Sequence, residues 1–247
     1  MRIVIYPTYE ALSAKAAAHV MQLMAASDQP LLCPASGDTP AGLFKAMANT
    51  YRPSQYAGWS FVGLDEWVGL NGADEGSCRY SINRDLFRPL GISENNICFF
   101  DGRSTDLPGE CLRAEQFIRE KNGIDVAILG VGMNGHVAMN EPGSAIDSRT
   151  RVVTLHPVTK KVGQKYFNQP QVLDEGITLG IGTLLESRHI ILMVSGKHKA
   201  VIVQKMLEQP ATNELPASLL LQHPSVTLFL DADAAVCLSN REMNNNQ

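Results

Sequence analysis

Short apolar runs recur along the chain and are separated by stretches in which apolar residues fall at helical spacing. An apolar run bounded by turn-forming residues is typical of a strand buried in a sheet. In the stretch 10–26, by contrast, Leu12, Ala16, Val20 and Met24 fall four residues apart and would share one face of a helix. We predict strands at 3–6, 31–33, 59–64, 97–100, 126–129, 151–155, 189–194 and 226–230.

Helical patterns lie between most of these predicted strands. They cover 10–26, 77–87, 110–121, 159–167 and 197–207, with shorter helices expected from Pro40, Pro216 and Asp231. The glycine-rich segment 176–183 favours neither a helix nor a strand. The alternation predicts an α/β fold with a mainly parallel sheet and helices on both faces. No Pro- or Ser-rich linker interrupts it, so we expect residues 1–247 to form a single domain, with the polar tail 240–247 frayed.

Composition and charge exclude several classes of protein. The net charge is -4 and no basic run occurs, which argues against nucleic acid as a partner. No apolar stretch reaches 18 residues, so no membrane-spanning helix is expected. The five cysteines are scattered and odd in number, which predicts reduced thiols and a cytoplasmic protein. These features leave the oligomeric state open, a homo-oligomer included.

The predicted strand at 126–129 ends in the pattern Gly-x-Gly-x-x-Gly at 130–135. Glycines let the backbone approach a ligand closely, and open α/β sheets bind ligands where their strands end. The polar residues that follow are Asn134, His136, Asn140 and Glu141. A nicotinamide cofactor does not fit, because Pro142 interrupts the helix and the next strand ends in His156 rather than in an acidic residue. No second ligand stands at metal-binding spacing from His136, so no metal is expected.

Two further strand ends carry candidate chemistry. The loop at 36–39 lies between a strand and a helix that Pro40 begins, so its free N–H groups form an anion cradle or an ordinary capped turn. The strand at 59–64 runs into Asp65 and Glu66, which point in different directions, so only one of them is expected to reach a site. The alternative for this acidic pair is a helix cap or a solvated surface. The lysines at 197–199 could likewise meet a phosphate or begin a solvated helix.

Five motifs together resemble the glucosamine-6-phosphate deaminase/isomerase family. They are Ser-Gly-Asp-Thr-Pro at 36–40, Leu-Asp-Glu-Trp-Val-Gly at 64–69, Gly-x-Gly-x-Asn-Gly-His-x-x-x-Asn-Glu-Pro at 130–142, Ser-Arg-Thr-Arg at 148–151 and Gly-Lys-His-Lys-Ala at 196–200. The resemblance covers essentially the whole chain. It implies a Rossmann-like fold and conversion of an amino-sugar 6-phosphate and water into a ketose 6-phosphate and ammonia, without a metal or organic cofactor.

The resemblance also implies roles for individual residues. Asp65 is similar to the general base that moves a proton between C2 and C1 of the sugar. His136 is similar to the group that assists ring opening at O5, and Glu141 to its acidic partner. The residues implied for the phosphate are Ser36, Gly37, Asp38, Thr39, Lys165 and Lys199.

Three positions depart from the glucosamine pattern. Asn134 stands where an Asp is usual, and it can hold the His136 ring by hydrogen bonds but cannot stabilise an imidazolium by charge. Lys165 replaces an Arg, so a single ammonium charge stands in place of a guanidinium that can donate two parallel hydrogen bonds. Val153 replaces a Lys of allosterically activated members, so activation by N-acetylglucosamine 6-phosphate is not expected. Asn134 and the Pro-Ala-Ser-x-Leu motif at 216–220 resemble the galactosamine-6-phosphate branch more closely.

Two other functions compete with this interpretation. A 6-phosphogluconolactonase would also carry a Gly-His motif, but we expect Asp before its Gly and no Asn-Glu-Pro after it. A sugar-phosphate-sensing module would bind the phosphate without keeping the base. The joint presence of Asp65, His136 and Glu141 favours the enzyme.

Overall fold

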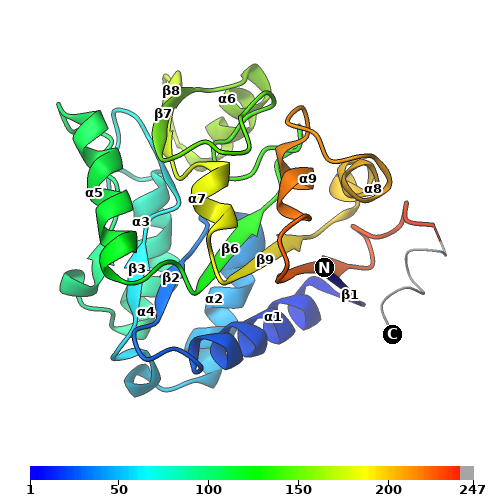
Figure 1. Ribbon diagram of the computed structural model, residues 1–247, viewed down its shortest axis with the longest axis horizontal. Helices are drawn as coiled ribbons and strands as arrows, with labels where there is room; N and C mark the ends of the chain where they lie inside the picture. Colours follow the sequence, from blue (N-terminus) through cyan, green and yellow to red (C-terminus); the bar gives the residue numbers. More distant parts are fainter. Residues whose placement is uncertain (240–247) are drawn as a thin grey trace.

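The computed structural model describes residues 1–239, and its centre is a sheet of seven parallel strands (Figure 1). The spatial order of the strands is β1-β10-β9-β6-β2-β3-β5, and every neighbouring pair is parallel. The strands are β1 (Arg2–Tyr6), β2 (Leu31–Cys33), β3 (Ser60–Val62), β5 (Ile97–Cys98), β6 (Val126–Gly130), β9 (His189–Val194) and β10 (Val226–Asp231). The predicted α/β fold with a mainly parallel sheet is confirmed.

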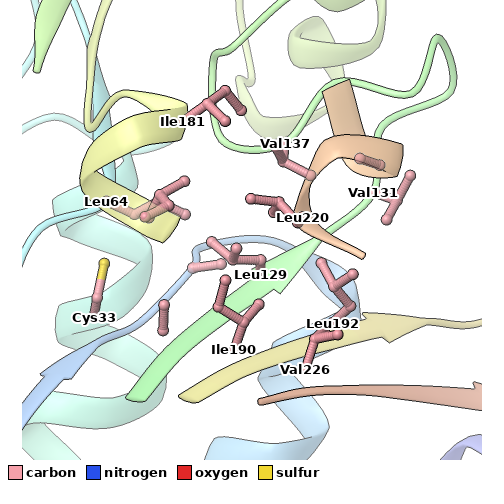
Figure 2. Packing of buried hydrophobic residues seen from close by; sticks show 14 of the residues in the cluster. Cys33, Leu64, Leu129, Val131, Val137, Ile181, Ile190, Leu192, Leu220 and Val226 are labelled. Carbon is pink, nitrogen blue, oxygen red and sulfur yellow. The ribbon is translucent and has the colours of Figure 1, made fainter. Parts of the chain in front are cut away.

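The central strands are apolar on both sides because helices cover both faces of the sheet. Successive residues of β6 point to opposite faces, so Leu129 belongs to one hydrophobic cluster and Ile128 to the other. Their partners in the β9 register, Leu192 and Ile191, divide in the same way. Figure 2 shows the first cluster, where Leu129 and Leu192 lie on the strands and Ile181 and Leu220 come from helices above them.

Two sets of helices build these faces. On one face lie α1 (Tyr9–Met24), α2 (Asp38–Thr50), α3 (Cys78–Ile82) and α4 (Arg88–Leu90). On the other face lie α5 (Leu107–Glu120), α7 (Ile181–Leu185), α8 (Ala200–Glu208) and α9 (Pro216–Leu220). Thr8 begins α1 by accepting a hydrogen bond from the Ala11 N–H, as expected of a Thr at this position.

A second sheet, which the sequence pattern did not predict, lies beyond the carboxyl ends of the central strands. It is antiparallel and consists of β4 (Asp65–Trp67), β8 (Glu175–Thr178) and β7 (Arg151–Thr154). Figure 1 shows β7 and β8 at the top of the molecule beside α6 (Pro157–Gly163). The predicted strand at 59–64 therefore ends at Val62, and the chain crosses from one sheet to the other before Asp65.

Other local predictions need correction. The helix predicted to end at Phe87 continues through a π turn (Asn83–Phe87) into α4, where Pro89 is tolerated near the start of the segment. Phe99 and Phe100 lie outside β5. The helix predicted from Asp231 to Cys237 is a series of turns, and the segment 176–183 divides into β8 and the start of α7. The tail at 240–247 lies outside the described residues.

Among the helices of residues 1–239, none is long and apolar enough to cross a membrane.

Replacing Ile128 by Ala should test how far stability depends on the centre of the sheet. Ile128 is fully buried in β6, so its truncation leaves a cavity and should lower the free energy of unfolding by about 2–5 kcal/mol. Leu112→Ala is the matched control, because that side chain is 72% exposed and its loss should cost under about 0.5 kcal/mol. Urea denaturation measures both, and equal losses would contradict this account of the core.

Candidate active site

A cavity of about 400 Å³ opens where β2, β6 and β9 end, between the central sheet and the small sheet. It brings together residues that lie far apart in the sequence. The predicted site residues that line it are Ser36, Gly37, Asp38, Thr39, Asp65, His136, Lys165 and Lys199. Asn134 and Glu141 contact the His136 side chain. All ten predicted residues therefore gather at one place.

The sequence left open whether the acidic pair Asp65 and Glu66 reaches a site or caps a helix, and the structure gives one role to each residue. Asp65, the first residue of β4, lines the cavity, while its backbone pairs with Thr178 of β8. Glu66 points away from the cavity and is fully buried. Its carboxylate accepts the backbone N–H groups of Trp67, Cys78 and Arg79, each at 2.9 Å. Glu66 thus anchors the start of α3 against β4, and only Asp65 is available to a ligand.

Burial sets the proton affinity of both carboxyl groups. Loss of solvent raises the pKa of Asp65 to about 6, and a hydrogen bond from the Cys78 thiol opposes part of that rise. Burial raises the pKa of Glu66 to about 8, against the effect of its three backbone donors. Asp65 is therefore ionised at neutral pH and still close to its pKa, which is the condition for an effective general base.

His136 belongs to a chain of hydrogen bonds behind the cavity. Its Nδ1 lies 2.6 Å from Asn134 Oδ1, and Asn134 Nδ2 donates to Glu141 Oε2 at 2.9 Å. Nδ1 also lies 3.6 Å from Glu141 Oε2 and 3.1 Å from the Thr159 hydroxyl. Because Asn134 Oδ1 can only accept, the proton of the neutral imidazole resides on Nδ1, and Nε2 is left able to take another.

The environment of His136 keeps its ring neutral. Burial lowers the pKa of His136, and the Glu141 carboxylate opposes this effect, while Lys199 and His156 reinforce it. The backbone allows the close packing of this ring because residue 132 is a glycine. A Cβ at Gly132 would lie 2.3 Å from the imidazole Cε1 atom, so no other residue fits without moving the ring.

The cavity also contains two cationic side chains, Lys165 and Lys199. The segment at 36–39 includes the start of α2, which begins at Asp38 and not at Pro40 as predicted, and Gly37 before it holds a φ of +111°, which favours glycine. Lys165, from the 3₁₀ turn Gln164–Tyr166, places Nζ 2.6 Å from Asp38 Oδ2. Lys199 Nζ donates to the Val131 carbonyl at 2.7 Å, and burial lowers the pKa of this lysine to about 8. Two lysines beside a strand-to-helix loop can neutralise the charge of a phosphate.

Several residues that line or shape the cavity were not predicted. They include Tyr9, Cys78, Thr159, Tyr166 and Ser195. Asp231 was also missed, although its carboxylate holds the loop at 195–196 by accepting the Ser195 hydroxyl and the Gly196 N–H. None of these residues belongs to one of the five motifs, and tertiary folding brings each of them to the cavity or, for Asp231, to the loop beside it. Over residues 1–239, no group of three or more His, Cys, Asp or Glu side chains is arranged to hold a metal ion.

Comparison with known proteins assigns the family. A family model described as glucosamine-6-phosphate isomerases/6-phosphogluconolactonase matches residues 7–229. The chain belongs to this family. The family resemblance inferred from the five motifs is therefore confirmed.

Similar proteins match over nearly their full length. The chain is 37% identical over 237 residues to the glucosamine-6-phosphate deaminase of Geobacillus sp. (strain WCH70), covering 95% of this chain and 94% of that protein. It is 37% identical over 240 residues to glucosamine-6-phosphate deaminase 2 of Bacillus subtilis (strain 168), covering 95% and 96%. A solved structure of a monomeric glucosamine-6-phosphate deaminase superposes with a TM-score of 0.92 at 34% identity, covering 96% of this chain and 100% of that chain.

More distant structures share the fold alone. The 6-phosphogluconolactonase from Trypanosoma brucei superposes with a TM-score of 0.74 at 20% identity, covering 96% of this chain and 98% of that chain. This likeness shows that the same fold occurs in a protein named for another activity, so the fold does not decide the reaction.

Titration of the Asp65 carboxyl by carbon NMR should give a pKa of about 6. Cys78→Ala should raise this value further, because the thiol hydrogen bond stabilises the ionised form and its loss favours the proton. Cys111→Ala, which removes a buried thiol from α5 outside the cavity, is the control and should leave the titration unchanged. A lower Asp65 pKa in the Cys78 variant would refute the inferred contact.

Proposed function

We propose that the protein opens the ring of an amino-sugar 6-phosphate, isomerises the sugar from aldose to ketose and releases its nitrogen as ammonia. The observation that carries this proposal is one cavity lined by a buried carboxyl with a pKa of about 6, a neutral histidine and two lysines. The reaction needs these three elements: a base for a carbon-bound proton, a group for the ring oxygen and a site for the phosphate. The names of the similar proteins support the same chemistry.

The phosphate supplies binding energy remote from the reacting carbons. In the proposal it lies against the loop at 36–39, where Lys199 and Lys165 neutralise its charge. Lys165 is paired with Asp38 in the free protein, so part of its charge is already compensated before the phosphate arrives. Binding of the phosphate in the same cavity as Asp65 orients C1 and C2 towards that carboxyl, and such orientation lowers the barrier of the chemical steps.

Ring opening is assigned to His136. The hemiacetal must lose the proton of its O1 hydroxyl, and its ring oxygen O5 must gain one as the C1–O5 bond breaks. A neutral imidazole with a free Nε2 takes the first proton and returns it to O5. Asn134 fixes the tautomer of the ring through Nδ1, and the Glu141 carboxylate stabilises the imidazolium that exists between the two transfers.

Isomerisation and deamination follow from proton transfer at C2. Asp65 removes the hydrogen of C2 as a proton, the released electron pair moves through C1 to O1 of the aldehyde, and O1 takes a proton from solvent, which gives an enaminol. Asp65 then returns its proton to C1 and the nitrogen releases one proton to solvent, which leaves a hydroxymethyl group at C1 and an imine at C2. Water adds to the imine carbon and ammonia leaves, so the products are the ketose 6-phosphate and one ammonia per sugar.

The finer choice of sugar concerns the configuration at C4. Asn134 and the motif at 216–220 favour galactosamine 6-phosphate by resemblance, while the names of the similar proteins favour glucosamine 6-phosphate. The proposal covers both epimers as one substrate class. The ratio of kcat/KM for the two sugars, measured side by side, identifies the preferred one.

Purified protein should release ammonia from galactosamine 6-phosphate or from glucosamine 6-phosphate, as followed by a coupled ammonia assay. The unphosphorylated sugars are the control and should be poor substrates, because they lack the group that the lysines bind. Tight binding of both sugar phosphates without release of ammonia would contradict the enzyme proposal and favour a sensing module. Faster hydrolysis of 6-phosphogluconolactone than of either amino sugar would favour the lactonase.

Asp65→Asn should lower kcat by roughly 10²–10⁴-fold, because the amide has the shape of the carboxyl but cannot accept the C2 proton. The dissociation constant of the substrate should change little, since the phosphate end of the cavity is untouched. Single-turnover kinetics and calorimetry separate these two quantities. Turnover that survives in this variant would show that another group is the base.

A further inference from the structure

The hydroxyl of Tyr9 contacts the first turn of α2, although the two lie about thirty residues apart in the sequence. It donates to the carbonyl oxygens of Asp38 at 2.7 Å and Thr39 at 3.0 Å. It also accepts the backbone N–H of Gly42 at 2.7 Å. In an α-helix the N–H of residue 42 and the carbonyl of residue 38 are the two ends of one i→i−4 bond. The Tyr9 hydroxyl therefore bridges the two ends of the first i→i−4 pair that lies within α2, which begins at Asp38.

This contact holds a turn that has little other support. The residue before α2 is Gly37, whose position provides no side-chain cap for the helix. Helix starts normally rely on such a cap to satisfy their free N–H groups. Tyr9 does not replace that cap, because the Gly42 N–H that it accepts lies beyond the first four N–H groups of the helix. It adds a contact from α1 to the start of α2, since Tyr9 is the first residue of α1 and α1 packs along α2.

The fit between Tyr9 and α2 is close enough to require a glycine. A Cβ at Gly42 would lie 2.6 Å from the Tyr9 hydroxyl oxygen and 2.5 Å from Ser13 Oγ. Any larger residue would push the tyrosine away from the helix. Tyr9 also lines the cavity together with the loop at 36–39, so its contact is made at the edge of the candidate phosphate site.

We propose that Tyr9 is a positioning residue that fixes the loop at 36–39 in the geometry that receives the substrate phosphate. This inference rests on the proposed function only in taking a phosphate as the group bound by the loop. Without the hydroxyl, the Asp38 and Thr39 carbonyls lose a donor, and the loop can relax. The phosphate must then order the loop as it binds, which weakens binding and leaves the proton transfers at Asp65 unaffected.

Tyr9→Phe removes the hydroxyl and keeps the ring. The expected result is a roughly five-fold increase in KM for the amino-sugar phosphate and in the dissociation constant of inorganic phosphate, as expected for one lost hydrogen bond, with kcat within about two-fold. Calorimetry with inorganic phosphate and steady-state kinetics measure these quantities on the full chain. Gly42→Ala keeps the hydroxyl but displaces it, and should raise both constants in the same direction.

Tyr56→Phe is the matched control. The Tyr56 hydroxyl donates to the Met47 carbonyl at 3.1 Å, near the other end of α2, and Tyr56 does not line the cavity. Both tyrosine variants lose a hydroxyl that binds the same helix, so both should lower the melting temperature, but only Tyr9→Phe should weaken phosphate binding. Equal phosphate affinities in the two variants would overturn the proposal and leave Tyr9 a structural residue.

The outcome is separable from that of the proposed function. If neither amino sugar releases ammonia, the proposed reaction fails, while the phosphate titrations of Tyr9→Phe and Tyr56→Phe still decide the role of Tyr9. If ammonia is released and the two variants bind phosphate equally well, the reaction stands and the positioning role fails.

Discussion

The burial of the Asp65 carboxyl is the constraint on which the rest of the site depends. Removing this group from water raises its pKa to about 6, which makes it a stronger base than an exposed aspartate while it stays ionised at neutral pH. The small antiparallel sheet makes this burial possible by carrying Asp65 on β4 above the ends of the parallel strands. Glu66 then ties β4 to α3, which brings the Cys78 thiol to the Asp65 carboxyl and limits the rise in its pKa.

The other parts of the site, around His136 and around the loop at 36–39, lie after other strands of the central sheet. After β6, Gly132 lets the His136 ring pack against the backbone, and Asn134 connects that ring to Glu141. The polar end combines the loop at 36–39 with two lysines from other segments. Each part is held by its own contacts, so a buried carboxyl, a neutral imidazole and two lysines lie together in one cavity.

The sequence predicted the features that depend on local pattern. The central strands follow from apolar runs, and the glycines around His136 mark a close approach of side chain and backbone. The small sheet escaped prediction because its three strands are short and pair across long separations, as Asp65 does with Thr178. Cys78 and Tyr9 were not predicted to belong to the site for the same reason. Each contacts it through tertiary structure, which the spacing of residues along the chain does not reveal. For the neighbouring acidic residues at 65 and 66, the sequence predicted that only one reaches the site, but not that the other accepts three backbone N–H groups and anchors α3 against β4.

Exchange of hydrogen at C1 of the ketose product tests the central claim most directly. It reports the proton transfer assigned to Asp65 even when the amino-sugar phosphate formed in the reverse reaction is not released. Ketose 6-phosphate of either C4 configuration is incubated with the protein and ammonium in heavy water, and deuterium at C1 is followed by NMR. The account predicts that the wild-type protein introduces one deuterium at C1, and that Asp65→Asn binds the ketose phosphate without catalysing exchange. Exchange by Asp65→Asn at the wild-type rate would contradict it.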